Sequence, residues 1–148
     1  MESAPALGIT TLTLYAFSSD NWRRPRGEVD NLMLLLQRHL DTECAHMTDS
    51  GVRLSVIGRR DRIPGPLGRS IAHVEGRTSG GTALHLRLAI DYSAREALLA
   101  AAGRVAAGAP PTRQAFEQSL SEAIHAPSGT RDVDLLIRTG GEQRLSDF

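Results

Sequence analysis

The amino-acid sequence predicts an α/β fold, in which a central, mainly parallel sheet is flanked by helices. Short segments of β-branched and aromatic residues alternate along the chain with segments of helical periodicity. Such alternation is typical of βαβ units, whose strands run parallel. The length of 148 residues suits one domain with its own hydrophobic core, and it is too short for two domains of ordinary size. We therefore expect a single domain over residues 1–148.

The first strand is predicted over residues 9–17, where β-branched, aromatic and other apolar side chains dominate. Residues 18–27 are polar and include Pro25 and Gly27, which predicts a loop. A helix is predicted from Glu28 onward, because apolar residues recur there at helical spacing. The members of this stripe are Val29, Leu32, Met33, Leu36 and Leu40.

This first helix is apolar on more than one side. Leu34 and Leu35 lie off the main stripe, so either the helix is buried all round or one of its flanks lines an apolar cavity. Gly51 is expected to end the helix, because glycine readily adopts the left-handed conformation found after helices.

The middle of the chain predicts two further strands. Residues 52–57 alternate between apolar and polar side chains, and a loop follows over residues 58–66. A short amphipathic helix then carries Leu67, Ile71 and Val74. Residues 83–90 alternate more regularly, and their apolar side chains share one face: Leu84, Leu86, Leu88 and Ile90.

The last third predicts two helices and a final strand. Residues 93–107 are rich in alanine and helical, and Thr112 is a suitable N-cap for the next helix. That helix carries Phe116, Leu120 and Ile124. Residues 133–137 (VDLLI) predict a last buried strand, which the loop RTGGEQR follows.

Composition excludes several classes of protein. The hydrophobic fraction of 41% argues against intrinsic disorder, and no apolar run is long enough to span a membrane. The N-terminus lacks the basic and apolar regions of a secretory signal, and the single cysteine suits a reducing, cytoplasmic location. The net charge of +0 gives no indication of nucleic-acid binding.

Two loops carry the groups that could bind a ligand, because ligands of open parallel sheets bind beyond the carboxyl ends of the strands. The first loop follows the opening strand and contains Ser18, Ser19, Asn21, Trp22, Arg23, Arg24 and Arg26. The second follows the final predicted strand and contains Arg138, Arg144, Ser146 and two glycines. Arginine forks, hydroxyls and accessible backbone amides suit a diphosphate. Alternatively, these arginines are solvated or form surface ion pairs, which is the better interpretation for any one of them alone.

Both loops carry long matches to a known family. The segments LTLYAFSSDNWRRPRGEVDNLM and DVDLLIRTGGEQRLSDF resemble the signatures of the cis-prenyltransferases of the undecaprenyl diphosphate synthase type. VRLSVIGRRDRIP and LHLRLAIDYSAREAL are similar to the strands and loops of the same family, so the resemblance covers residues 8–148.

The resemblance implies a (poly)prenyl diphosphate synthase, which condenses isopentenyl diphosphate with an allylic prenyl diphosphate to form cis double bonds. It implies Mg²⁺, a homodimer, a cytoplasmic enzyme and peripheral membrane contact through the lipid product. Arg138, Arg144 and Ser146 match the positions that hold isopentenyl diphosphate, and Leu84 matches a residue at the floor of the product tunnel. The mobile loop and helix that close over the substrates and assist proton removal are matched by Ser18, Asn21, Trp22, Arg24 and Glu28.

The chain departs from the family pattern at single positions and at both ends. Asp20 replaces the usual Glu and Asp147 the usual Asn, while Arg87 and Asp91 stand where the family often has Asn. The family's N-terminal strand, its Mg²⁺-binding aspartate loop and the helix with the C-terminal glutamate have no match here. We therefore expect an N- and C-terminally incomplete domain, an incomplete metal site, little transferase activity from this chain alone, and an exposed sheet edge that favours association.

Two weaker metal patterns and two other functions stay open. His39, Glu43 and His46 share one predicted helix face, and Asp132 and Asp134 form a D-x-D, but ordinary polar surface explains both better. The main alternative function is a non-catalytic pseudoenzyme or partner subunit that binds diphosphate or a complete synthase. The intact FSSDNW loop argues against a purely structural subunit, and the length of both motifs argues against an unrelated phosphate-binding module.

Overall fold

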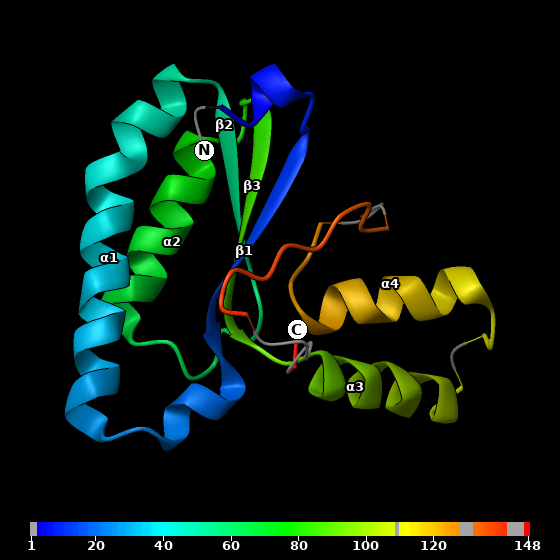
Figure 1. Ribbon diagram of the computed structural model, residues 1–148. Helices are drawn as coiled ribbons and strands as arrows, with labels where there is room; N and C mark the ends of the chain where they lie inside the picture. The colour runs from blue at the N-terminus through cyan, green and yellow to red at the C-terminus, as the bar shows by residue number, and fades with distance from the viewer. Residues whose placement is uncertain (1–2, 109, 128–131, 142–146) are drawn as a thin grey trace.

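The computed structural model describes residues 3–108, 110–127, 132–141 and 147–148. Its centre is a parallel three-stranded sheet of order β1–β3–β2 (Figure 1). The strands are β1 (Thr11–Ser18), β2 (Val52–Ile57) and β3 (Leu84–Tyr92). The predicted α/β class is therefore confirmed, and the three strands lie where the sequence places them.

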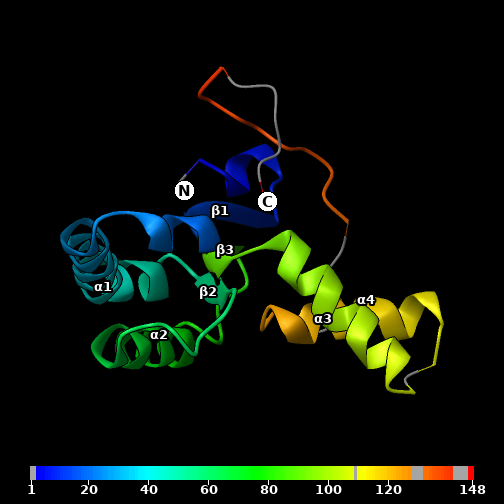
Figure 2. The same cartoon turned by 90° about the horizontal axis from the view of Figure 1, so that it is seen from below.

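Two helices, α1 (Arg26–Asp49) and α2 (Gly65–Arg77), lie side by side on one face of the sheet (Figures 1 and 2). Their apolar stripes bury against the alternating side chains of β2 and β3, because removing this apolar surface from water drives the packing. The core side chains that are nearly inaccessible to solvent are Met47, Leu54, Val56, Leu67, Ile71, Val74, Leu84 and Ile90.

The second helical pair, α3 (Ala94–Ala106) and α4 (Arg113–Ala123), packs together to one side of the sheet (Figure 2). Each helix begins at a side-chain cap. The Ser93 hydroxyl accepts a hydrogen bond from the Glu96 N–H, and the Thr112 hydroxyl accepts one from the Ala115 N–H. Two short 3-10 helices complete the described structure: η1 (Pro5–Leu7) and η2 (Ser19–Arg23).

The prediction of a last buried strand over residues 133–137 is wrong. The described structure has no strand there, and Val133, Leu135 and Ile137 are 75%, 73% and 72% exposed. A strand requires a neighbouring backbone for its hydrogen bonds, and apolar side chains alone do not provide one. Within the described residues β1 pairs only with β3, so its outer edge takes no strand.

Helix α1 is buried along one stripe only. Val29, Met33 and Leu40 are buried, whereas Leu34 is 43% exposed and Leu35 is 63% exposed. The alternative that this helix is buried all round is therefore wrong. α1 ends at Asp49, before Gly51, as predicted.

Candidate functional site

The carboxyl ends of the three strands gather three loops at one edge of the sheet. β1 leads into η2, β2 leads into the loop over residues 58–64, and β3 ends beside the first turn of α3. Gly58 makes this convergence possible, because its φ is +121° and a Cβ there would lie 2.0 Å from the Ile90 carbonyl oxygen. The loops therefore meet where ligands of parallel sheets normally bind.

A buried carboxylate stands at the centre of this edge. Asp91 is 0% exposed, and its φ of 52° lies in the left-handed region, which aspartate tolerates better than most residues. The Arg62 guanidinium donates two hydrogen bonds to this carboxylate, from Nε to Oδ2 at 2.9 Å and from Nη2 to Oδ1 at 2.5 Å. The Ser19 hydroxyl donates a third hydrogen bond to Oδ1 at 3.1 Å. Residues from β3, from η2 and from the loop after β2 thus join a single network.

Trp22 packs beneath the same arginine. The Arg62 guanidinium carbon lies 5.6 Å from the centre of the indole ring, a distance typical of cation–π contact. The indole ring also packs on Phe17 in an edge-to-face arrangement, with ring centres 5.3 Å apart. The indole N–H is buried and has no acceptor among the described residues. The predicted loop residue Trp22 is therefore held partly within the core.

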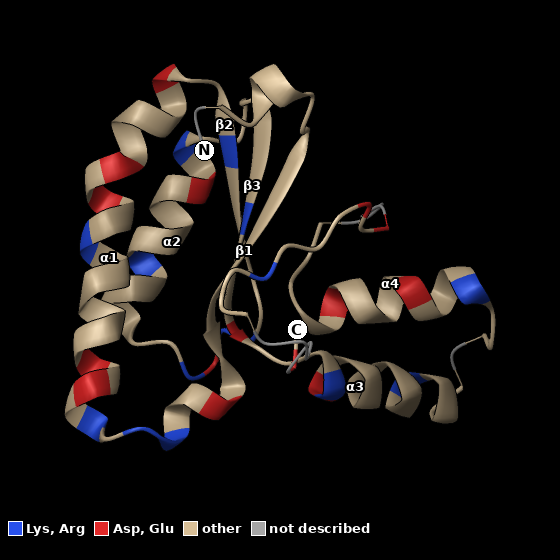
Figure 3. Cartoon of the chain, in the orientation of Figure 1, with Lys and Arg blue, Asp and Glu red and all other residues tan. Residues whose placement is uncertain are grey.

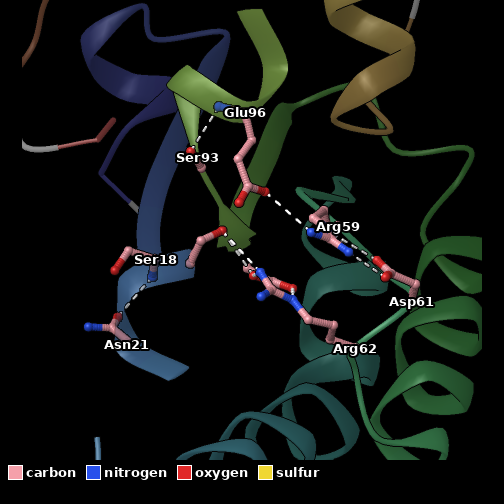
Figure 4. A network of polar contacts seen from close by, with 9 residues as sticks. Ser18, Asn21, Arg59, Asp61, Arg62, Ser93 and Glu96 are labelled. Carbon is pink, nitrogen blue, oxygen red and sulfur yellow. Dashed lines mark hydrogen bonds and ion pairs between the residues drawn. The ribbon is translucent and has the colours of Figure 1, made fainter. Parts of the chain in front are cut away.

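The turn that carries Trp22 is closed by its own side chains. The Ser18 backbone N–H donates to Asn21 Oδ1 at 2.8 Å, which ties the start of η2 to its third residue. Figure 4 shows the Asn21 amide nitrogen pointing away from Ser18. The structure thus brings Ser18, Asn21 and Trp22 together in one turn, as the sequence suggests.

A second ion-pair network joins the 58–64 loop to α3. Arg59 binds Asp61 at 2.6 Å and Glu96 at 3.5 Å (Figure 4). The hydrogen bonds of Asp61 raise the pKa of the Arg59 guanidinium, and those of Arg59 lower the pKa of the Asp61 carboxyl. Both partners are well exposed, so this network contributes little stability compared with the buried pair.

The arginines of the first loop form surface ion pairs. Arg24 binds Glu28 at 2.7 Å, and both side chains are about half exposed: 49% and 48%. Arg23 pairs with Asp20, and Arg26 pairs with Asp30 at the longer distance of 4.0 Å. Figure 3 shows the acidic and basic positions side by side along η2 and the start of α1. These arginines therefore already have acidic partners.

The C-terminal loop reaches the same edge of the sheet through its last residues. The Asp147 carbonyl accepts a hydrogen bond from the Ala94 N–H at 3.0 Å, and its carboxylate accepts one from the Arg95 N–H at 3.2 Å. Phe148 packs on Tyr15 at 4.7 Å and on Tyr92 at 5.5 Å between ring centres. Arg138 is exposed, whereas Arg144 and Ser146 lie outside the described residues.

The pKa of Tyr15 depends on charged residues near both candidate loops. Its pKa is raised above the usual value, chiefly by burial and further by the negative charges of Asp147 and Asp20, while a hydrogen bond with Ser18 opposes the shift. The two aspartates belong to the C-terminal loop and to η2 respectively. Residues from the C-terminal segment and from η2 therefore both contribute to the electrostatic environment of this one side chain of β1.

The sheet face turned away from α1 and α2 carries a row of basic side chains. Arg53 Nη2 lies 3.1 Å from His85 Nδ1, and Ser55 Oγ lies 2.8 Å from His85 Nε2. Burial and the charges of Arg53 and Arg87 lower the pKa of His85, which favours its neutral form. Burial also lowers the pKa of Arg87, whose Nε has no partner in the described part of the chain.

Leu84, which the resemblance assigns to the product tunnel, lines neither of two cavities in the described structure. The larger, of about 380 Å³, lies between the ends of β2 and β3 and the helices α3 and α4, and Gly58, Asp91 and Ala97 help to line it. The other, of about 170 Å³, lies near the start of β2. Leu84, the predicted tunnel residue, is 1% exposed at the start of β3 and packs in the core.

The described residues contain no group of three or more His, Cys, Asp or Glu side chains arranged to hold a metal ion. His39 and His46 lie exposed on α1, and Asp132 and Asp134 are exposed on the segment after α4. Within the same part of the chain, no helix is both long and apolar enough to cross a lipid bilayer.

The fold is that of an α/β protein whose candidate ligand site lies at the carboxyl edge of its sheet, and sequence comparison identifies its family. The family model described as putative undecaprenyl diphosphate synthase matches residues 1–148. The chain belongs to this family, and the resemblance inferred from the two loop motifs is confirmed.

Curated relatives match the whole chain. Isoprenyl transferase 1 of Bradyrhizobium diazoefficiens is 55% identical over 148 residues, and isoprenyl transferase of Geobacter sulfurreducens is 42% identical over 153 residues. Both alignments cover 100% of this chain, but only 58% and 61% of those proteins. The chain thus spans about three fifths of the length of these relatives.

Two solved structures share the fold. A probable undecaprenyl diphosphate synthase from Campylobacter jejuni superposes with a TM-score of 0.84 at 36% identity, covering 100% of this chain and 68% of the other. Lavandulyl diphosphate synthase from Lavandula x intermedia, in complex with dimethylallyl diphosphate, gives 0.86 at 33% identity, covering 98% and 64%. The predicted cis-prenyltransferase fold is therefore confirmed.

Sequence reasoning missed the central pair of the site. It considered the loops after the first and last predicted strands, but not the loop after β2, which supplies Arg62. Asp91 was noted only as a departure from the family pattern. The rule that ligands and polar residues gather at the carboxyl ends of parallel strands applies equally to β2 and β3, so it could have indicated both residues.

Proposed function

We propose that this domain, residues 1–148, binds isopentenyl diphosphate and belongs to a (poly)prenyl diphosphate synthase. The reaction condenses isopentenyl diphosphate with an allylic prenyl diphosphate, with cis geometry at the new double bond. Family membership supports the reaction class, and the dimethylallyl diphosphate in the lavandulyl diphosphate synthase complex is an allylic diphosphate held on the same fold. A homodimer and a cytoplasmic location belong to the same proposal, as does membrane contact through the product.

One observation carries the proposal. Asp147 caps the start of α3, and Phe148 packs on Tyr15, three residues before Ser18. Asp147 and Phe148 therefore lie at the edge of the sheet where η2 begins. We assign Arg138, Arg144 and Ser146 to the diphosphate, which their charge and hydroxyl groups suit.

The first loop is assigned to the reacting centre. Ser18, Asn21 and Trp22 form one turn there, so their polar groups can act together on a substrate. Arg24 and Glu28 form an ion pair at the start of α1, and we infer that a diphosphate would compete with Glu28 for the arginine. Leu84 is assigned to the floor of the product tunnel.

Mg²⁺ is expected for the family, but the described residues do not fit a magnesium site. The described residues contain no cluster of three or more side chains that could hold a metal ion. The buried carboxylate of Asp91 is already paired with the positive charge of Arg62. Magnesium prefers several oxygen ligands, including one or two carboxylates. We therefore assign no step of the reaction to a metal held by these residues.

The test is a titration of isopentenyl diphosphate, and separately of inorganic pyrophosphate, into the chain and into the Arg138→Ala/Arg144→Ala double variant. Loss of two charge-assisted contacts of roughly 1.5–3 kcal/mol each would weaken binding by at least about a hundredfold. The matched control is the Arg38→Ala/Arg113→Ala variant, whose arginines are exposed and lie outside both candidate loops. Equal affinity of the wild type and the first variant would refute the assignment of the site.

A further inference from the structure

We propose that Arg62 and Asp91 form a buried latch that positions the Ser18–Trp22 turn, with Arg62 as the positioning residue. The inference deepens the proposed function, because it takes this turn to be the part of the site that covers the substrates. The latch itself is defined by contacts that need no ligand: the two-armed ion pair, the Ser19 hydroxyl and the Trp22 ring.

The latch connects three separate segments of the chain. Asp91 is the second-last residue of the central strand β3, Arg62 belongs to the loop after β2, and Ser19 and Trp22 belong to η2 after β1. Arg62 Nη2 also lies 3.3 Å from Ser19 Oγ, so the arginine contacts the turn at both Ser19 and Trp22. The turn is therefore held to the sheet through one guanidinium.

The negative charge of Asp91 fixes the orientation of the Arg62 guanidinium. A fully buried carboxylate is costly without a partner, so Asp91 holds Arg62 in one orientation. A bidentate arginine–carboxylate pair also fixes the plane of the guanidinium, and this plane lies over the Trp22 ring. An asparagine at position 91 would keep the size of the side chain but would lose the charge that orients Arg62.

The neighbouring Arg59–Asp61 pair provides a matched comparison. It lies in the same loop and joins the same residue types, but Asp61 is 62% exposed. Among the described residues, Arg59 forms its ion pairs with Asp61 and Glu96, and neither of them belongs to η2. Removing the Asp61 charge should therefore leave the turn unchanged.

The experiment uses the fluorescence of Trp22, which is the only tryptophan in the chain. Emission maximum and acrylamide quenching are measured, without substrate, for the wild type and for the Asp91→Asn, Asp91→Ala, Arg62→Met and Asp61→Asn variants. Circular dichroism and thermal melting of each variant separate a local change at Trp22 from loss of the fold.

The proposal expects a red shift of emission and a higher quenching constant in Arg62→Met and Asp91→Ala, a smaller change in Asp91→Asn, and none in Asp61→Asn. The Arg62→Met/Asp91→Asn double variant should show no more change than Arg62→Met, because both substitutions break one contact. Folded Arg62→Met and Asp91→Asn variants with wild-type Trp22 signals would overturn the latch, whatever happens to the melting temperature. If Asp91→Ala does not fold, these two variants decide the outcome.

Isopentenyl diphosphate binding then separates this inference from the proposed function. Wild-type Trp22 signals in the latch variants, together with normal binding by the wild type, would overturn the latch alone. Changed Trp22 signals, together with no loss of binding in the Arg138→Ala/Arg144→Ala variant, would overturn the proposed function and leave the latch standing.

Discussion

At the scale of single residues, Asp91 shows how a strained and buried position can serve a site. Its left-handed backbone and full burial are both unfavourable on their own. They are offset by three donors, two from Arg62 and one from Ser19. Asp91 is fully buried whereas Arg62 is 35% exposed, so removing Arg62 leaves a buried carboxylate without its partner and costs up to about 3–5 kcal/mol.

Tyr15 gives a prediction about alkaline pH at the same scale. Burial raises the pKa of both Tyr15 and Tyr92 above 10.0, so the folded state holds these protons more tightly than the unfolded state. The contribution of these two tyrosines to the free energy of unfolding is fully present below their pKa in the unfolded state. It is lost as the pH rises through their pKa in the folded state. The free energy of unfolding, measured by denaturant titration, should therefore fall above a pH of about 10.

The Tyr15→Phe/Tyr92→Phe variant should flatten this alkaline decline. All 17 basic residues are arginine, so no lysine titrates in the same range. At pH 7, where both tyrosines are neutral, the variant serves as its own control for lost packing and hydrogen bonding. An equally steep alkaline decline in the variant would contradict the role assigned to these tyrosines.

At the scale of elements, the helix ends are set by local chemistry. Ser93 and Thr112 are the N-caps of α3 and α4, and both hydroxyls accept backbone hydrogen bonds. Capping relieves backbone N–H groups that the helix cannot satisfy internally, which is why the position of a serine or threonine predicts a boundary. Thr112 was identified from the sequence for this reason, and the structure confirms it.

The Thr112→Ala variant should lower the free energy of unfolding by about 1 kcal/mol, the usual cost of losing an N-cap side chain. Urea denaturation measures this loss. Thr42→Ala is the matched control, since Thr42 is exposed in the interior of α1 and alanine favours helices more than threonine does. Equal effects of the two substitutions would show that the Thr112 cap contributes nothing.

At the scale of the whole molecule, the uncovered apolar surface is the main feature outside the site. Val133, Leu135, Leu136 and Ile137 are exposed, and β1 is an edge strand that carries the exposed Leu14 and Tyr15. Exposed strand edges and contiguous apolar patches promote association between chains. The sequence-based expectation of an exposed edge agrees with this surface.

We therefore expect this chain to associate with itself as concentration rises, and sedimentation velocity measures this directly. The Leu135→Glu/Ile137→Glu variant should weaken association at least about tenfold, or about 1.4 kcal/mol. Leu7→Glu is the control, because Leu7 is equally exposed, at 74%, but lies on η1. Association that is unchanged in the double variant, or that is lost equally in Leu7→Glu, would contradict this assignment.

The sequence by itself determined the elements whose pattern is local. β2 coincides with the predicted residues 52–57, the apolar stripe of α2 is buried as expected, and the turn from Ser18 to Trp22 joins the residues that the motif indicated. Burial of apolar side chains at period two or at helical spacing acts within one element, so neighbouring residues suffice to predict it.

Only the tertiary structure decided which residues meet. Residues 133–137 have a strand-like sequence, yet a strand requires a backbone partner that the described fold does not place beside them. Arg62 and Asp91 are separated by 29 residues and pair only because β2 and β3 are neighbours in the sheet. Pairing between distant segments depends on the arrangement of the strands, and this arrangement is a property of the packed molecule rather than of any one segment.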